Sequence, residues 1–220
     1  MKSKYLLPFL IFSSITFSLG LQAAHHEKEE VNYKEAQKAV TDLFGWDMKN
    51  PPITIERISD HLHVLFGNGG NILVSIGENG VLLVDDQMPE AKNVILRAIR
   101  KLGGRSVDYV INTHWHFDHA EGNNVFGPSG AQIIAQENSR YMMLNPQPIN
   151  LSFIVYPQQP YPLEAVPEIT YKNSMNLHLN GDRIELYHFG HAHTTGDSAV
   201  YLRDSNVLHL SLIHISEPTR

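Results

Sequence analysis

The sequence predicts one domain of the α+β class over residues 53–209, and three observations indicate this class. The chain has 220 residues, 42% of them apolar and 18% charged, which is enough apolar material to bury a sizeable core. Short apolar runs bounded by turn residues recur along it and are typical of strands. Stretches in which apolar residues return every three or four positions lie between them and are typical of helices. No internal repeat divides the chain, so we expect a single continuous domain.

Four predicted strands come first and form a meander that feeds one sheet. Turn residues such as Asn68-Gly69-Gly70 separate these strands, which span residues 54–58, 62–67, 71–76 and 81–84. A helix is predicted over residues 89–102, because Pro89 is a favourable first residue and Gly103-Gly104 ends the helical spacing. A buried strand over residues 107–112 follows, and a histidine-rich segment begins where this strand ends.

The second half of the domain is predicted to alternate strands with one helix and one long connection. A strand over residues 132–135 and a helix over residues 136–144 precede a connection that contains six prolines between residues 146 and 167. A connection of this length inside a compact domain is usually functional or mobile. The remaining strands are predicted over residues 177–179, 183–189, 199–202 and 206–208.

Both ends of the chain carry segments that we exclude from the domain. Lys2 and Lys4 precede an apolar run that closes near Ala24, so residues 1–24 are predicted to be a secretory signal peptide and the protein to be periplasmic or secreted. A polar arm over residues 25–52 leads into the domain. Residues 210–220 match the translation of a common transposase sequencing adapter, so we interpret them as an adapter-encoded tail and the domain as incomplete.

Charge and composition exclude several classes of function. The formal net charge is −6 and the 17 lysines and arginines form no cluster, so we expect no nucleic-acid partner. The absence of cysteine excludes disulfide scaffolds, thiolate metal sites and a lipid-bearing cysteine. We therefore expect no stable membrane association once the signal peptide is cleaved. The 13 histidines stand out, because histidine is the commonest metal ligand.

The first motif, Thr113-His114-Trp115-His116-Phe117-Asp118-His119, has the spacing of a metal site. Residues two apart on an extended segment point the same way, so His114 and His116 can share one ion. Asp118 and His119 are displaced toward a neighbouring position, where a carboxylate and an imidazole suit a second divalent ion. Packing alone does not account for this motif, because each buried polar group needs a partner of its own.

The second motif, Gly190-His191-Ala192-His193-Thr194-Thr195-Gly196-Asp197, lies between two predicted strands. Catalytic zinc sites take three protein ligands and leave one position for water, so the first pair of histidines lacks a third from a distant loop. We choose His193 for that ligand, although the spacing alone does not separate it from His191.

Together these residues resemble the metallo-β-lactamase superfamily over residues 53–210. The H-x-H-x-D-H segment after a buried strand carries the resemblance, with support from residues 81–86 and from Gly-His-Ala-His-Thr-Thr-Gly-Asp at 190–197. The resemblance implies a four-layer αβ/βα sandwich with the metals between the sheet edges. It further implies that the first zinc is held by His114, His116 and His193, the second involves Asp118 and His119, and Asp85 is a buried aspartate that orders the site.

The implied activity is that of a zinc-dependent hydrolase acting on a small-molecule substrate. In such an enzyme a metal-bound hydroxide attacks an ester, thioester, lactone or β-lactam carbonyl, and Asp118 is the catalytic residue that orients it. In the family an aspartate that bridges the two metals follows the last predicted strand, and a further histidine ligand comes later in the chain. In this sequence Ser211 and Leu212 stand where the bridging aspartate is expected, so both of these ligands are missing. We therefore expect the 220-residue chain to bind one or two zinc ions, the second weakly, and to be a poor enzyme.

Two alternative functions use the same ligands. The alternatives are an iron-dependent oxidoreductase of the sulfur dioxygenase type and a periplasmic metal-binding protein without turnover.

Other histidines are not expected to bind metal. His61 and His63 alternate with Leu62 and Val64, which predicts that both face outward from a strand. Trp46 is predicted to be in the core or to line a pocket.

Overall fold

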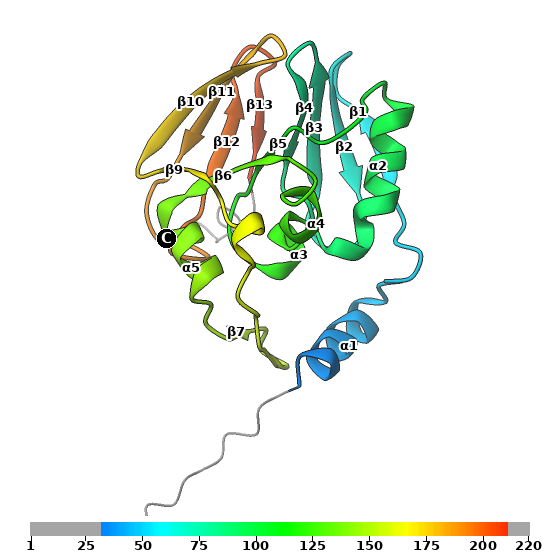
Figure 1. The fold of residues 1–220 in the computed structure, drawn as a ribbon, viewed down its shortest axis with the longest axis vertical. Helices are drawn as coiled ribbons and strands as arrows, with labels where there is room; N and C mark the ends of the chain where they lie inside the picture. Colours follow the sequence, from blue (N-terminus) through cyan, green and yellow to red (C-terminus); the bar gives the residue numbers. More distant parts are fainter. Residues whose placement is uncertain (1–31, 211–220) are drawn as a thin grey trace, which may run out of the picture. The chain divides into compact units, whose positions relative to one another are not determined.

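The computed structural model describes residues 32–210 (Figure 1). The predicted signal peptide, the first part of the polar arm and residues 211–220 of the predicted tail lie outside the described residues. Within residues 32–210, no helix combines the length and the apolar character that a membrane span requires.

A seven-stranded mixed sheet forms the first half of the domain, in the order β1-β2-β3-β4-β5-β6-β9. Its strands β1 to β4 pair antiparallel as the predicted meander, and β4, β5, β6 and β9 pair in parallel. Because parallel strands end at the same edge of a sheet, the loops that follow β4 and β5 begin side by side. The strands are β1 (Thr54–Arg57), β2 (Leu62–Phe66), β3 (Ile72–Gly77), β4 (Gly80–Val84), β5 (Tyr109–Ile111), β6 (Gln132–Gln136) and β9 (Ile169–Tyr171).

Helices occupy the connections between the parallel strands. The helix predicted from Pro89 begins as a 3-10 turn, η1 (Pro89–Ala91), and continues as α2 (Lys92–Lys101). The short helices α3 (Phe117–Ala120) and α4 (Asn123–Phe126) follow β5, and α5 (Glu137–Leu144) follows β6. Part of the polar arm is also helical and forms α1 (Tyr33–Phe44), which ends at Gly45 in the left-handed conformation.

A second sheet of four antiparallel strands follows in chain order and stands beside the first in Figure 1. Asn180 and Gly181 join its first two strands in a two-residue turn, and both have positive φ, 54° and 84°. Such turns favour Asn-Gly, which tolerates this backbone conformation. The strands are β10 (Ser174–Leu179), β11 (Asp182–Tyr187), β12 (Ala199–Leu202) and β13 (Val207–His209).

Two apolar clusters hold the sheets and α2 together. One cluster joins both sheets, with Leu73 and Ile111 from the first and Ile184 and Val200 from the second. The other lies between the first sheet and α2, where Ile95 and Ile99 are fully buried. Because β2 to β5 contribute side chains to both clusters, these strands are buried on both faces.

The structure adds elements that the sequence pattern did not predict. The three-residue strand β9 extends the first sheet, and the proline-rich connection contains β7 (Ile149–Asn150), β8 (Val155–Tyr156) and the 3-10 turn η2 (Leu163–Ala165). These elements are too short to show a periodic pattern. The three strands form because neighbouring strands supply their hydrogen bonds, whereas η2 is closed by a local bond from the Ala165 N–H to the Pro162 oxygen at 2.9 Å. The four-layer form of the sandwich stays a prediction.

Candidate metal centre

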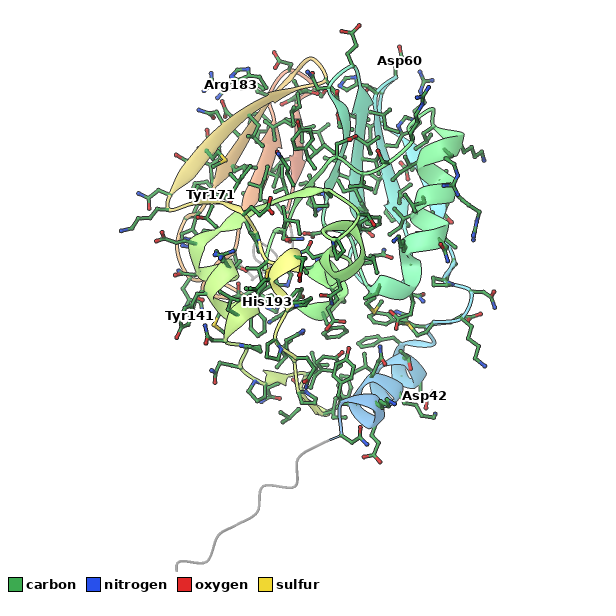
Figure 2. The ribbon with its side chains drawn as sticks, in the orientation of Figure 1. Asp42, Asp60, Tyr141, Tyr171, Arg183 and His193 are labelled. Atoms are coloured by element: carbon green, nitrogen blue, oxygen red, sulfur yellow. The ribbon has the colours of Figure 1, made fainter. Side chains whose placement is uncertain are left out.

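Three predicted ligands meet where the two sheets approach each other. His114 and His116 follow β5, while His193 lies in the loop between β11 and β12. One nitrogen atom from each ring lies within 4.8 Å of the corresponding atoms of the other two. His193 Nε2 is 3.0 Å from His116 Nδ1, and the ring centroids of His114 and His193 are 5.1 Å apart. Figure 2 places His193 below the strands of both sheets.

The surroundings of these rings favour the neutral imidazole that binds metal. Burial lowers the pKa of His114 well below its usual value, and the nearby rings of His119, His116 and His193 add to the effect. Burial, with His193 and His119, lowers the pKa of His116 to about 3. The pKa of His193 is also lowered, chiefly by burial. At neutral pH the three rings therefore carry no charge and can present nitrogen lone pairs to one ion.

The carboxylate of Asp85, the residue that directly follows β4, fixes the ring of His119. Its Nδ1 lies 2.8 Å from Asp85 Oδ2, and the same carboxylate accepts hydrogen bonds from the Thr113 backbone N–H at 2.7 Å and the Thr113 hydroxyl at 2.8 Å. Burial acts to raise the pKa of Asp85, but the ring of His119, with help from His209, holds it below its usual range. Asp85 has a φ of 62°, a strained backbone position that often marks a functional site.

Asp118 lies on the other side of His119 and completes a second group of donors. Its Oδ2 is 3.6 Å from His119 Nε2, the ring nitrogen that does not face Asp85. Burial acts to lower the pKa of His119, but the carboxylates of Asp118 and Asp85 outweigh burial and raise it to about 9. A second ion at this position would therefore replace a proton on His119.

The β2–β3 loop approaches this second group so closely that only glycine fits. A Cβ atom on Gly70 would lie 2.5 Å from the ring of His119, and one on Gly69 would lie 2.8 Å from the backbone oxygen of Asp118. The Gly70 N–H donates a hydrogen bond to that oxygen at 2.9 Å. The sequence pattern predicted only that these glycines form a turn. Their role in the site depends on contacts with Asp118 and His119, which lie far from them in the sequence.

The loop that carries His193 is fixed by hydrogen bonds on both of its sides. The Asp197 carboxylate accepts from the Thr194 N–H and from the Thr194 hydroxyl, both at 2.7 Å, so it orders this loop. The Ser198 N–H donates to the Thr113 oxygen at 2.8 Å, which ties the second motif directly to the first. Ser139 at the start of α5 donates to the Gly196 oxygen at 2.8 Å.

Other histidines lie outside this group. His191 is exposed and lines a small separate cavity beside Phe189, so the structure separates it from His193 where the spacing did not. The prediction that His63 faces outward is wrong: it is 7% exposed, because β2 is covered on both faces. His61 contacts Asp182 of the second sheet, with its Nε2 2.8 Å from Asp182 Oδ2.

A cavity of about 670 Å³ opens next to the metal centre and includes residues that the sequence did not assign to it. His116, Asp118, His119 and His193 lie in its lining, together with the polar residue Asn71. His209, at the end of β13, also lines the cavity, with its Nε2 3.8 Å from Asp85 Oδ2. No signal in the sequence indicates this contact, because it requires β13 and β4 to belong to facing sheets.

Comparison with known proteins decides the family. The model of the Metallo-beta-lactamase superfamily matches residues 65–210, which is more than half of the chain. This chain belongs to the metallo-β-lactamase superfamily. The family model thus confirms the resemblance that the two histidine motifs indicated.

Solved structures of metallo-β-lactamases share this mixed α/β fold. The enzyme from Pontibacter korlensis has 18% identity and a TM-score of 0.58 over 71% of this chain and 70% of that one. FEZ-1 from Legionella gormanii has 19% sequence identity and a TM-score of 0.57, over 76% of this chain and 64% of that one. BJP-1 of Bradyrhizobium japonicum, a subclass B3 enzyme, has 19% sequence identity and a TM-score of 0.56, over 70% of this chain and 58% of that one. At these identities the likeness shows the fold alone.

Proposed function

We propose that this protein is a zinc-dependent hydrolase that cleaves an ester, thioester, lactone or β-lactam bond. The single observation that carries the proposal is the meeting of three histidine nitrogens within 4.8 Å at the edge of a cavity, in a chain of this superfamily. We also propose that the protein is periplasmic or secreted, and that its sheets belong to the family's four-layer sandwich. The two sheets that share one apolar cluster support the last point.

The donor set fits zinc. Imidazole nitrogens suit this ion, and three protein ligands leave a position open for water. His114, His116 and His193 would hold the first ion, while Asp118 and His119 would contribute to a second. Asp85 would fix the ring of His119 through its Nδ1, as outer carboxylates do for metal-binding histidines.

Bound zinc supplies two things: it lowers the pKa of a coordinated water to about 7, and it polarises a carbonyl group. The side chain of Asp118 is 24% exposed at the cavity, so one carboxylate oxygen can accept a hydrogen bond from the attacking water and take its proton. The water oxygen forms a bond to the carbonyl carbon, and the bond from that carbon to the leaving oxygen, sulfur or nitrogen breaks. The proton passes from Asp118 to the leaving atom, so an ester or thioester gives an acid and an alcohol or thiol, and a lactone or β-lactam gives a single ring-opened hydroxy or amino acid.

The decisive experiment measures zinc binding and hydrolysis together. We expect the purified protein to bind one zinc ion tightly and, once loaded, to cleave at least one of four chromogenic probes at a low rate, because Asp118 and His119 alone would hold a second ion weakly. The probes are an ester, a thioester, a lactone and a cephalosporin. His193→Ala should weaken zinc binding at least about 100-fold, because it removes a ligand. The matched variant His191→Ala should bind zinc as the wild type does, since His191 lies outside the group.

Three outcomes would contradict the proposal. Equal zinc affinity in both variants would show that His193 is not a ligand. Tight zinc binding with none of the four probes cleaved would favour a metal-binding protein without turnover. Iron retained in preference to zinc, together with oxygen consumption in the presence of a persulfide, would favour the dioxygenase alternative.

A further inference from the structure

Two hairpin turns, one from each sheet, lie side by side at the top of Figure 1 and are joined by a reciprocal pair of hydrogen bonds. Asn79 lies in the turn between β3 and β4, and Asn180 lies in the turn between β10 and β11. The Asn79 N–H donates to Asn180 Oδ1 at 3.1 Å, and the Asn180 N–H donates to Asn79 Oδ1 at 2.9 Å. We call this pair of contacts the asparagine clasp.

Both asparagines of the clasp directly precede a glycine, and this dipeptide is chemically reactive. The backbone nitrogen of a glycine is unhindered, because no Cβ atom shields it, so it can attack the side-chain carbonyl carbon of the asparagine before it. The chain contains three such dipeptides, at Asn68-Gly69, Asn79-Gly80 and Asn180-Gly181. How fast each one reacts in the folded protein depends on how its side-chain amide is held.

The side-chain amide of Asn180 is held by the first sheet. Its Nδ2 donates to the Ser75 hydroxyl at 3.1 Å and to the Gly80 oxygen at 3.0 Å, while its Oδ1 accepts from Asn79 in the clasp. Gly77 packs against the same amide, since a Cβ atom there would lie 2.6 Å from Asn180 Oδ1. To meet the nitrogen of the next glycine, this amide would have to break three hydrogen bonds, so the structure protects Asn180.

Asn68 is protected by burial in the β2–β3 loop. It is 5% exposed, and its Nδ2 donates to the Asp47 oxygen at 3.1 Å. The following Gly69 is packed against Asp118, because a Cβ atom on this glycine would lie 2.8 Å from the Asp118 backbone oxygen. A ring that joined Asn68 to Gly69 would have to displace this contact, so we expect the ring to form slowly.

The side-chain amide of Asn79 differs, because nothing holds the nitrogen that has to leave. Asn79 is exposed, and its Nδ2 makes no hydrogen bond to any residue within the described range 32–210. Its Oδ1 accepts from the Asn180 N–H, which polarises the side-chain carbonyl and stabilises the negative charge that develops on this oxygen during attack. The clasp thus protects one of its two asparagines and activates the other.

We propose that Asn79 is a site of spontaneous modification, at which the folded protein converts this asparagine to a mixture of aspartate and isoaspartate. The nitrogen of Gly80 forms a bond to the Asn79 Cγ atom, the Cγ–Nδ2 bond breaks, and Nδ2 leaves as ammonia with the proton of the Gly80 N–H. Water then opens the ring at either carbonyl carbon: its hydroxyl completes the new acid, and its proton returns to the Gly80 nitrogen. One product keeps the normal backbone, and the other carries the backbone through Cγ.

The isoaspartate product breaks the clasp. It lengthens the backbone of a two-residue turn by one CH₂ group, so the N–H and the side-chain oxygen at position 79 no longer face Asn180 together. The clasp precedes β4, whereas Asp85 follows it, about 17 Å further along the strand. We therefore expect the modification to weaken the contact between the sheets and to leave zinc binding unchanged. This inference does not depend on the proposed hydrolase activity.

Peptide mass spectrometry of the full chain tests the assignment. During incubation of the folded protein at pH 8 and 37 °C, Asn79 should convert at least about tenfold faster than Asn180, which must first break its hydrogen bonds. Asn79 should also convert faster than Asn68. In urea the three asparagines should convert at similar rates, because each one precedes a glycine and none is held by the fold. Labelling by an isoaspartate-specific methyltransferase identifies the second product.

Two serine variants locate the protection. Ser75→Ala removes one acceptor of the Asn180 amide and should speed the conversion of Asn180 about two- to tenfold. Ser205→Ala is the matched control and should leave all three rates unchanged, because it also removes a hydroxyl from a contact between the sheets but touches neither asparagine of the clasp. The isoaspartate form, separated by ion exchange, should unfold at a lower urea concentration than the unmodified protein and bind zinc within twofold of it.

Conversion of Asn68 or Asn180 as fast as that of Asn79 in the folded protein would overturn the inference. An Asn79 that converts in urea but stays intact in the folded protein would also overturn it, because the turn would then protect this residue too. An isoaspartate form that unfolds like the unmodified protein would show that Asn79 does not join the sheets. The proposed function fails separately: weak zinc binding by the unmodified protein would contradict the metal centre and leave this inference standing.

Discussion

Two histidine–aspartate pairs of nearly identical geometry lie in different parts of this domain. His119 Nδ1 is 2.8 Å from Asp85 Oδ2 at the metal centre, and His61 Nε2 is 2.8 Å from Asp182 Oδ2 at the contact between the two sheets. Both aspartates are buried. Figure 2 shows Asp60 and Arg183, the chain neighbours of the second pair, at the end of the molecule away from His193.

The two pairs differ in what the other ring nitrogen faces. His119 Nε2 faces Asp118 at 3.6 Å, and its ring lies 4.3 Å from that of His114. His61 Nδ1 instead lies 3.4 Å from the Ser59 hydroxyl, and Ser205 donates to Asp182 Oδ2 at 2.7 Å. A histidine–carboxylate pair therefore does not by itself mark a functional site. Further donors around the second nitrogen make it part of a metal centre, whereas hydroxyl groups there make it a structural contact.

The largest expected effect separates the two regions by metal binding. His116→Ala removes a ligand and should weaken zinc binding at least about 100-fold, because even the loss of a residue that only orients a ligand costs about 10–100-fold. His61→Ala is the matched control at the inter-sheet contact and should leave zinc affinity unchanged. Competition with a chelating dye measures both. Equal losses in the two variants would show that the regions do not differ in this way.

Asp182→Asn should cost roughly 2–4 kcal/mol of stability at pH 7, because it leaves a buried hydrogen-bonded network incomplete. Burial acts to raise the pKa of Asp182, but hydrogen bonds from His61 and Ser205 hold it below its usual value of 3.8. The stabilisation is therefore complete above this value and is lost as the pH falls through the lower, folded-state pKa. Urea unfolding at pH 7, 5 and 3 should show the deficit shrink only at the lowest pH; a constant deficit would contradict the ionic contribution.

Asp85→Asn should change the titration of the metal centre. Removing this carboxylate takes away one of the two charges that raise the pKa of His119 to about 9, so the pKa should fall by about one unit or more. NMR titration of the histidine rings in metal-free protein measures the shift. Asp182→Asn should leave the His119 resonance unchanged, and an equal shift in both variants would indicate a general loss of structure.

The smallest effect concerns the hydroxyl beside His61. Ser59→Ala removes the contact to His61 Nδ1 and the acceptor for the Leu62 N–H at 3.2 Å, so stability should fall by about 0.5–1.5 kcal/mol. Zinc affinity should stay within twofold of the wild type. A change in zinc binding without a change in unfolding would reverse the assignment of this pair as structural.

Much of the fold and of the candidate ligand set was predictable from local sequence. The first four strands and the helix after Pro89 follow from apolar spacing and turn residues, and their observed bounds differ by only a few residues. His114 and His116 were identifiable because residues two apart on an extended segment share a direction. The strand β9 was not predictable, because three residues are too few to show a periodic pattern and the strand depends on pairing with β6.

The sequence by itself determined the element types, the two histidine motifs and the resemblance to the superfamily, because each of these depends on residues close together in the chain. The resemblance had already favoured His193 over His191 as a ligand, but only the tertiary structure brought His193 to His114 and His116 and placed His209 near Asp85. These contacts join elements far apart in the sequence. The spacing of residues along the chain carries no information about such distances, which are set by how the two sheets pack.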